Sequence, residues 1–207
     1  VIREGLKMYL ADNSQAWEMN ADGEYHRKKG RVPRIAQETG ATLVWHPMLL
    51  GGVFKATGNA SPVTVPAKGR WMNDDIARWA RRWGVPFTMN PHFPIHTLTL
   101  MRGACGLLMR QPDDFRRYVD AVFHAMWVAP RNLGDPAELA AVLTRAGFDA
   151  EAFVALVGAP EVKADLMART EASVARGAFG APTFFVGDQM FFGQDRLDFV
   201  RAALTAA

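Results

Sequence analysis

The most constraining feature of the sequence is a short segment near its C-terminal end, Gly180-Ala181-Pro182-Thr183, which stands between a predicted helix and a predicted strand. Proline lacks a backbone N–H, so a sheet tolerates it at the first residue of a strand but not in a central strand. A cis Ala181-Pro182 bond would turn backbone N–H and C=O groups toward a cleft, where an extended peptide can pair with them. A trans bond would only mark the start of the strand. The tetrapeptide alone leaves both arrangements open.

The residues that follow this proline predict a β-hairpin and a closing helix. Residues 182–186 and 189–192 are rich in aromatic and β-branched side chains, and Gly187-Asp188 between them is typical of a tight turn. Gly193 ends the second strand, and a helix is predicted over residues 195–206.

The first third of the chain predicts a strand–helix–strand unit and a loop. Residues 41–47 are β-branched and aromatic, and they lie between Gly40 and a final proline, which is typical of a strand. A helix is predicted over about 33–38, and residues 8–10 can serve as the first strand. Residues 51–68 contain three glycines and two prolines, which predict a loop. Loops this long in compact domains tend to be functional.

The middle of the chain, residues 62–168, predicts a block of helices. Met72, Ile76, Trp79 and Trp83 recur at helical spacing and predict a helix over 71–84. Other helices are predicted over 97–109 and 113–127, and from Asp135-Pro136, Phe148-Asp149 and Ala159-Pro160 onward. The sequence therefore predicts an α/β fold in which residues 1–61 and 169–207 share one sheet and residues 62–168 form a helical insertion domain.

Composition narrows the classes of function. The single cysteine, Cys105, allows no intrachain disulfide and no Cys-x-x-Cys pair, and its small and apolar neighbours favour a buried structural thiol. The net charge of +3 and the pI of about 9.2 come from scattered basic residues, which do not favour nucleic-acid binding. The same mild basic excess favours anionic small substrates.

Neither a membrane span nor a metal site is predicted. No apolar stretch approaches the ~20 residues that a membrane helix needs, and the first residues lack the apolar centre of a signal peptide. We therefore expect a cytoplasmic protein. Pro94 lies between His92 and His96 and interrupts the helical pairing of these two histidines, and the other histidines show no metal-binding spacing.

Several segments together resemble one family. The sequence is similar to the 2-hydroxychromene-2-carboxylate isomerases and kappa-class glutathione transferases, in the disulfide-oxidoreductase-like branch of the thioredoxin superfamily. The similar segments are residues 51–59, 66–68, 83–87, 123–127, 177–183 and 192–197. The resemblance extends over about residues 39–207. It implies a thioredoxin-like fold with a large all-helical insertion, glutathione as cofactor, a small aromatic or electrophilic substrate, and a homodimer.

The resemblance also implies roles for individual residues. Ala181 and Pro182 would pair with the cysteinyl backbone of glutathione, and Gln194 and Asp195 would hold its γ-glutamyl end. A helix N-terminus attracts the glutamyl carboxylate, and the Asp195 carboxylate can accept from the α-ammonium group. The alternative for Asp195 is a plain helix N-cap.

Four further residues are candidates by the same resemblance. Asn59 would contact glutathione or the substrate, Lys55 and Lys68 would meet a substrate carboxylate, and Trp71 would lie near the pocket. The alternatives are turn chemistry for Asn59, solvent exposure for the lysines and core packing for Trp71.

The expected catalytic residue is Ser14. In the family that this chain resembles, a serine after the first strand donates a hydrogen bond to the thiolate of bound glutathione, and the following helix adds a favourable dipole. Here Gln15 stands where the family has proline, and Asp12 stands where it has an aromatic residue. Residues 1–38 as a whole depart from the family pattern, so Ser14 as an ordinary cap or loop serine stays open.

The function implied is a glutathione-dependent isomerase of 2-hydroxychromene-2-carboxylate type, which acts in aromatic compound catabolism. Thiolate addition, bond rotation and release of unchanged glutathione would constitute covalent catalysis with a borrowed nucleophile. One alternative is a kappa-like glutathione transferase that acts on electrophiles. Another is a non-catalytic thiol- or peptide-binding module. The missing Cys-x-x-Cys pair disfavours redox catalysis.

Overall fold

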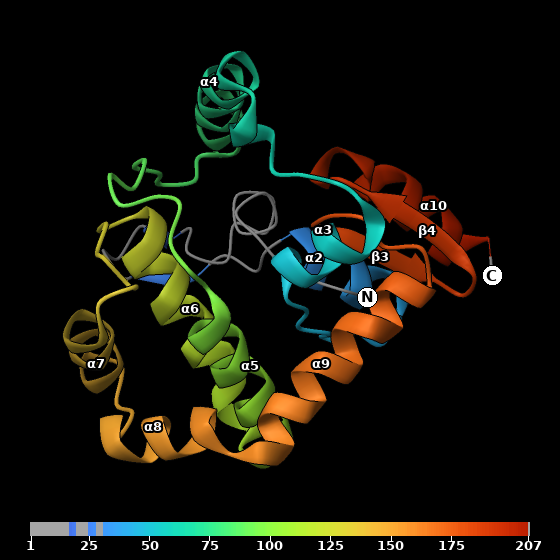
Figure 1. The fold of residues 1–207 in the computed structure, drawn as a ribbon. Helices are drawn as coiled ribbons and strands as arrows, with labels where there is room; N and C mark the ends of the chain where they lie inside the picture. The colour runs from blue at the N-terminus through green and yellow to red at the C-terminus, as the bar shows by residue number, and fades with distance from the viewer. Residues whose placement is uncertain (1–16, 20–24, 28–30, 207) are drawn as a thin grey trace. The chain divides into compact units, whose positions relative to one another are not determined.

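The computed structural model describes residues 17–19, 25–27 and 31–206. The described residues form two compact units (Figure 1). The first lies within Val1–His46, Leu50–Phe87 and Ser173–Ala207, and the second comprises Pro47–Leu49 and Thr88–Ala172. Residues 62–87, which the sequence assigns to the helical insertion, cluster here with the first unit.

The first unit contains two hairpins and several helices. Its elements are β1 (Trp17–Met19), β2 (Tyr25–Arg27), α2 (Arg31–Thr39), α3 (Leu50–Thr57), the short 3₁₀ helix η1 (Pro62–Thr64), α4 (Pro66–Trp83), β3 (Thr183–Val186), β4 (Gln189–Phe192), the 3₁₀ helix η2 (Gln194–Arg196) and α10 (Leu197–Thr205). β1 pairs with β2 and β3 pairs with β4, both antiparallel. The β3–β4 hairpin and α10 confirm the prediction for the C-terminal segment, whereas the β1–β2 hairpin was not predicted.

One predicted strand is absent. Residues 41–49 form neither strand nor helix, and among the described residues β3 and β4 pair only with each other. Leu43 and Trp45 nevertheless pack against the core while Thr42 and Val44 are exposed, so the alternation of a strand is kept. A strand also needs a partner for its hydrogen bonds. The strand predicted at residues 8–10 lies outside the described residues.

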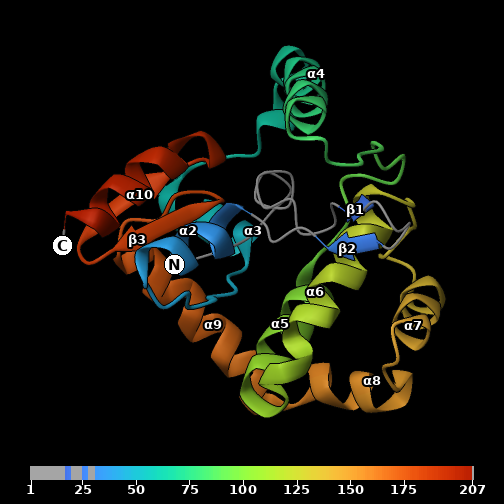
Figure 2. The same ribbon diagram turned by 180° about the vertical axis from the view of Figure 1, so that it is seen from behind.

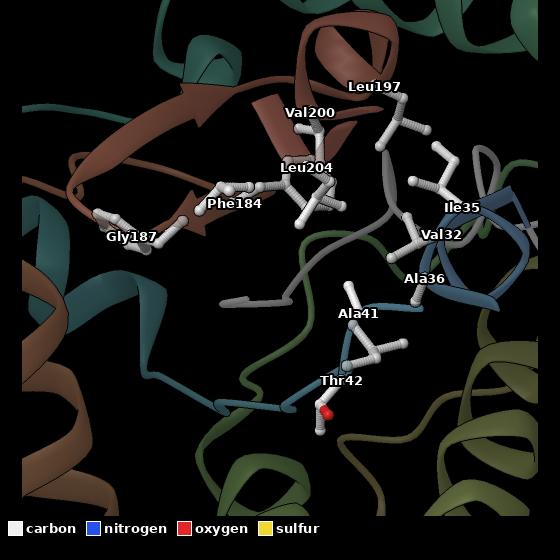
Figure 3. Close-up of a pocket in the computed structure, with 13 residues that line it drawn as sticks. Val32, Ile35, Ala36, Ala41, Thr42, Phe184, Gly187, Leu197, Val200 and Leu204 are labelled. Atoms are coloured by element: carbon white, nitrogen blue, oxygen red, sulfur yellow. The ribbon is translucent and has the colours of Figure 1, made fainter. Parts of the chain in front are cut away.

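The core of the first unit lies between α2, β3 and α10. These elements lie side by side in both views (Figures 1 and 2). Five buried residues form the cluster: Val32, Ile35, Phe184, Leu197 and Val200. A cavity of ≈ 210 Å³ adjoins it, lined mainly by apolar side chains of α2, residues 41–43, β3 and α10 (Figure 3).

The predicted loop over residues 51–68 is wrong in its first part, where α3 forms. Two glycines in α3 each disfavour a helix by ~1 kcal/mol, which is why the sequence pattern predicts a loop. Val53 is fully buried, so tertiary packing outweighs the propensity. Gly58 directly follows α3 and has φ +70°. This left-handed backbone conformation is common at the residue after a helix. α4 then begins at Pro66, five residues earlier than predicted, with proline in its first turn.

The second unit is helical, as the sequence predicts. It contains α5 (Leu98–Arg110), α6 (Pro112–Trp127), α7 (Pro136–Arg145) and α8 (Ala150–Gly158), and α9 (Pro160–Ala175) leads from this unit into the first. Asp135 caps α7 by accepting from the N–H groups of Ala137 and Glu138, at 2.8 and 3.4 Å. Within the described residues, every helix is too short or too polar to cross a bilayer.

Small residues let α5 approach its neighbours closely. Gly103 faces the Tyr118 hydroxyl and the Phe153 ring, and Tyr118 donates to the Leu100 carbonyl at 2.8 Å. Burial raises the pKa of Tyr118, so this hydroxyl keeps the proton that it donates. Cys105 on the same helix is fully buried, which confirms the prediction of a buried thiol.

Replacing Gly103 with alanine is expected to lower the free energy of unfolding by about 1–3 kcal/mol, because overpacked cores must shift to relieve the contact. The added Cβ would meet the Tyr118 hydroxyl at 2.5 Å and the Phe153 ring at 2.6 Å. Urea unfolding measures the change. Gly158→Ala, where a Cβ meets nothing within 4 Å, is the matched control. Equal stability of the two variants would contradict the close packing described here.

Candidate functional site

The two ends of the β3–β4 hairpin bring together two segments that the sequence singles out. The Ala181-Pro182 bond is cis, as one of the two alternatives predicted. The Gly193 N–H donates to the Pro182 carbonyl at 3.0 Å. Gln194 and Asp195 directly follow Gly193, so this hydrogen bond holds them next to the cis-proline segment although they are 12 or more residues away along the chain.

Asp195 is not a plain helix N-cap. It lies within η2, and the residues at the cap positions of η2 and α10 are Gly193 and Arg196, neither of which makes a side-chain capping bond. The Asp195 carboxylate is exposed and lies 3.3 Å from Nη1 of Arg196. A Cβ at position 193 would lie 2.5 Å from Oδ1 of Asp195, and Gly193 has φ +103°. Position 193 therefore needs glycine for its backbone conformation, and a Cβ there would also displace the Asp195 carboxylate.

Three predicted site residues line one cavity of ≈ 150 Å³. Trp71, Gln194 and Asp195 share it with other residues of α4: Met72, Asp75, Ile76, Trp79 and Trp83. Gln194 is only 7% exposed, whereas Trp71 is 61% exposed. The cavity thus combines indole walls with two carboxylates and one amide. Such walls attract an ammonium group both by charge and by the faces of the rings.

Trp79 and Trp83 of α4 also line this cavity, and the sequence analysis did not assign them to the site. Trp79 and Trp83 lie 4.7 Å apart between ring centroids, and their helical spacing predicted an apolar stripe. That prediction is confirmed, but the spacing contains no information on which distant segment the stripe faces. Only the fold brings α4 next to residues 194 and 195.

Asn59 links the end of α3 to the segment before the cis-proline. Its Nδ2 donates to the Phe179 carbonyl at 2.8 Å, and its Oδ1 accepts from the Ala60 N–H at 2.8 Å. The Phe179 ring in turn packs on Phe192 with centroids 4.6 Å apart. The Asn59 side chain therefore stabilises the turn after α3 and also contacts the segment before the cis-proline.

The remaining candidates lie apart from these contacts. Lys55 in the last turn of α3 and Lys68 in the first turn of α4 are exposed, and neither lines the cavities of ≈ 150 and ≈ 210 Å³. Ser14 lies outside the described residues. In the described part of the chain, no three His, Cys, Asp or Glu side chains gather as metal ligands would.

Comparison with known proteins identifies a family and several relatives with similar sequences. The DsbA-like thioredoxin domain matches residues 27–205. A 2-hydroxychromene-2-carboxylate isomerase from Sphingobium xenophagum is 33% identical over 177 residues, which cover 84% of this chain and 88% of the relative. Glutathione S-transferase kappa 1 from Homo sapiens is 28% identical over 168 residues, which cover 73% of each chain.

A solved structure supports the same relationship. That of a 2-hydroxychromene-2-carboxylate isomerase superposes with a TM-score of 0.75 at 25% identity, covering 96% of this chain and 89% of the other. The predicted thioredoxin-like fold with helices inserted into it is confirmed. The chain belongs to the DsbA-like thioredoxin-domain family, and its relatives there are 2-hydroxychromene-2-carboxylate isomerases and kappa-class glutathione transferases.

Proposed function

We propose that the protein is a glutathione-dependent isomerase of 2-hydroxychromene-2-carboxylate type, which acts in the cytoplasm as a homodimer in aromatic compound catabolism. The observation that carries this proposal is the juxtaposition of the cis-proline segment with Gln194 and Asp195 beside a cavity walled by tryptophan. The relatives named as isomerases support the reaction type.

The chemistry of the donor set fits glutathione. Asp195 offers an exposed carboxylate to an α-ammonium group, and Gln194 offers an amide at the inner wall of the same cavity. The backbone of Ala181, two residues before β3, is where the cysteinyl segment would pair as an added strand. Asn59 fixes the approach to this segment through the Phe179 carbonyl. When bound, glutathione would supply a thiol nucleophile, which we assign Ser14 to activate.

We assign the substrate side of the site to Trp71, Lys55 and Lys68. Trp71 presents a largely exposed indole at the cavity and would stack on an aromatic substrate. Lys55 and Lys68 are exposed cations near the two ends of the connection between α3 and α4. We assign them to steer and hold the substrate carboxylate.

Kappa-like transfer to electrophiles is the second candidate, and the human kappa-class relative favours it. Both reactions need the same activated thiol, so the products distinguish them. An isomerase returns glutathione unchanged, whereas a transferase consumes it into a conjugate. Assays with 2-hydroxychromene-2-carboxylate and with a model electrophile, each with and without glutathione, therefore test the reaction type.

Glutathione is expected to stabilise the protein, and Asp195→Asn is expected to weaken its binding by roughly 10- to 100-fold, since a hydrogen bond to a charged group contributes ~1.5–3 kcal/mol. At ~100 times the dissociation constant, the ligand adds about 2.7 kcal/mol to the stability of the native protein. Thermal melts and titration calorimetry measure both effects.

The control is Asp198→Asn on α10, whose carboxylate is 89% exposed and pairs with Arg31 at 3.6 Å. The Asp198→Asn variant should bind glutathione with the same affinity as the unmodified protein. Without ligand, Asp195→Asn should keep its melting temperature because the carboxylate caps no helix. No melting shift of the unmodified protein at millimolar glutathione would overturn the assignment of the ligand.

A further inference from the structure

The side chain of Phe192, the last residue of β4, connects two parts of the candidate site. Its ring packs on the Phe179 ring, with centroids 4.6 Å apart and planes tilted by 47°. The same ring lies against Gly180, because a Cβ added at that position would come within 2.8 Å of Phe192 Cε2. Phe179 and Gly180 directly precede Ala181, and Phe192 belongs to the strand that continues into the proposed γ-glutamyl end of the site.

This pair of rings is separate from the hydrophobic core. Successive side chains of a strand point to opposite faces, and Phe191 packs against the buried cluster of α2, β3 and α10, to which Phe192 does not belong. Phe192 is only partly buried, and the Phe179 ring that it meets is 37% exposed. Burial in the core therefore does not explain why an aromatic side chain stands at position 192.

Hydrogen bonds fix the backbone on the other sides of the same stretch. Asn59 donates to the Phe179 carbonyl at 2.8 Å, and Thr183 Oγ1 donates to the Gly180 carbonyl at 2.8 Å. Thr183 is fully buried and lies opposite Phe192 in the register of the hairpin. The carbonyls of residues 179 and 180 are therefore held, and the Phe192 ring fixes the separation between this stretch and β4.

The ring also adds a second point of attachment between the two parts of the site. The hydrogen bond from the Gly193 N–H to the Pro182 carbonyl, at 3.0 Å, joins them at one point. A single hydrogen bond tolerates a broad range of angles at the carbonyl oxygen, so it leaves rotation about the bond open. Contact of the Phe192 ring with Gly180 removes that freedom.

We propose that Phe192 is a positioning residue for glutathione, whose ring sets the separation between the backbone of Ala181 and the pair Gln194 and Asp195. The inference rests on the proposed function, because it assigns these two segments to two ends of one ligand. A ligand held at two places binds tightly only when the span between them matches its own length. Phe192 acts through Gly180 and the end of β4 rather than by touching the ligand.

Phe192→Ala is expected to weaken glutathione binding about tenfold, as measured by titration calorimetry on the folded protein. That factor corresponds to about 1.4 kcal/mol, which is close to the upper value for an aromatic pair. Phe192→Leu keeps an apolar side chain against Gly180 and should recover part of the lost affinity.

Gly180→Ala tests the same contact from the other side. Its Cβ would meet the Phe192 ring at 2.8 Å and should push the ring away, so this variant should also bind glutathione more weakly. In combination with Phe192→Ala it should add no further loss of affinity, because residues in contact have coupled effects. Additive losses in the double variant would contradict the contact as the cause.

Phe191→Ala is the matched control, since Phe191 is the adjacent residue of β4 and packs against the core. We expect it to lower the melting temperature more than Phe192→Ala does, and to leave glutathione affinity as in the unmodified protein. A purely structural role of Phe192 predicts a lower melting temperature without a change in affinity. Unchanged affinity in Phe192→Ala, or an equal loss of affinity in Phe191→Ala, would overturn the inference.

The unmodified protein distinguishes a failure of this inference from a failure of the proposed function. If it binds glutathione and Phe192→Ala binds equally well, the positioning role is wrong and the ligand assignment stands. If it does not bind millimolar glutathione, the ligand assignment and this inference are both wrong. Amide hydrogen exchange of the free protein adds a readout without ligand. Exchange at residues 193–195 should be faster in Phe192→Ala than in Phe191→Ala, and the reverse order would contradict the positioning role.

Discussion

Replacing Phe184 with alanine is expected to lower the free energy of unfolding by about 3–5 kcal/mol, as large-to-small core substitutions do. Phe184 is fully buried on β3 within the cluster that joins α2 to α10. We expect the loss of stability to lie at the upper end of this range. Phe184 already lines the cavity of ≈ 210 Å³, and its truncation would enlarge that cavity (Figure 3).

Tryptophan fluorescence during urea unfolding can follow this change, since Trp45 and Trp83 pack against the same cluster. Phe199→Ala on α10 is the control, because that ring is 59% exposed. Its effect should stay within about 0.5 kcal/mol, as surface substitutions usually do. If the two phenylalanine variants lose the same stability, Phe184 is not at the centre of the core.

Ser14→Ala is expected to reduce turnover by roughly 100-fold or more, the scale of losing one preorganised hydrogen-bond donor. A hydroxyl bonded to a thiolate lowers the pKa of the thiol, since hydrogen bonding to the charged form favours that form. Glutathione affinity should change little, because the other proposed contacts come from the cis-proline segment and η2. The ultraviolet absorbance of bound thiolate at neutral pH measures activation directly, beside the rate of isomerisation.

Ser14→Thr keeps a hydroxyl at this position and should retain part of the activity that Ser14→Ala loses. If bound glutathione shows no thiolate even in the unmodified protein, Ser14 does not activate it, and the protein is better described as a glutathione-binding relative. If the thiolate persists in Ser14→Ala, a different donor activates the thiol.

Elements whose limits depend on local chemistry were predictable from sequence. Asp135 caps α7, Gly84 ends α4 at φ +62°, and the turn at Gly187-Asp188 joins β3 to β4. The elements that were missed depend on distant partners. α3 forms around the buried Val53 despite its glycines, and residues 41–47 have strand alternation but no strand pairing in the described chain.

The same distinction applies to the site. The cis bond before Pro182 and a place for Trp71 near the pocket were expected from sequence resemblance. The structure shows that Trp71 shares a cavity with Gln194 and Asp195, and that the Gly193 N–H joins these two residues to the cis-proline segment. Asp75 also lines this cavity, and the sequence did not predict it. The residue pattern of a helix does not indicate which distant loop the helix will face. Sequence also suggested that Asp195 caps a helix, whereas η2 shifts the cap to its neighbours.

The hairpin separates two regions with opposite tolerance to changes in chain length. At one end of the hairpin, the hydrogen bond from the Gly193 N–H to the Pro182 carbonyl joins the two strands. The turn at Gly187-Asp188 lies at the other end, four strand residues away, which is about 13 Å at 3.3 Å per residue. A peptide tag grafted after Asp188 would lengthen an exposed turn and leave the tied end intact. Deleting one residue from β4 would invert the faces of its side chains and carry Asp195 out of register. Related genes should therefore vary in length at the turn and keep β4 constant.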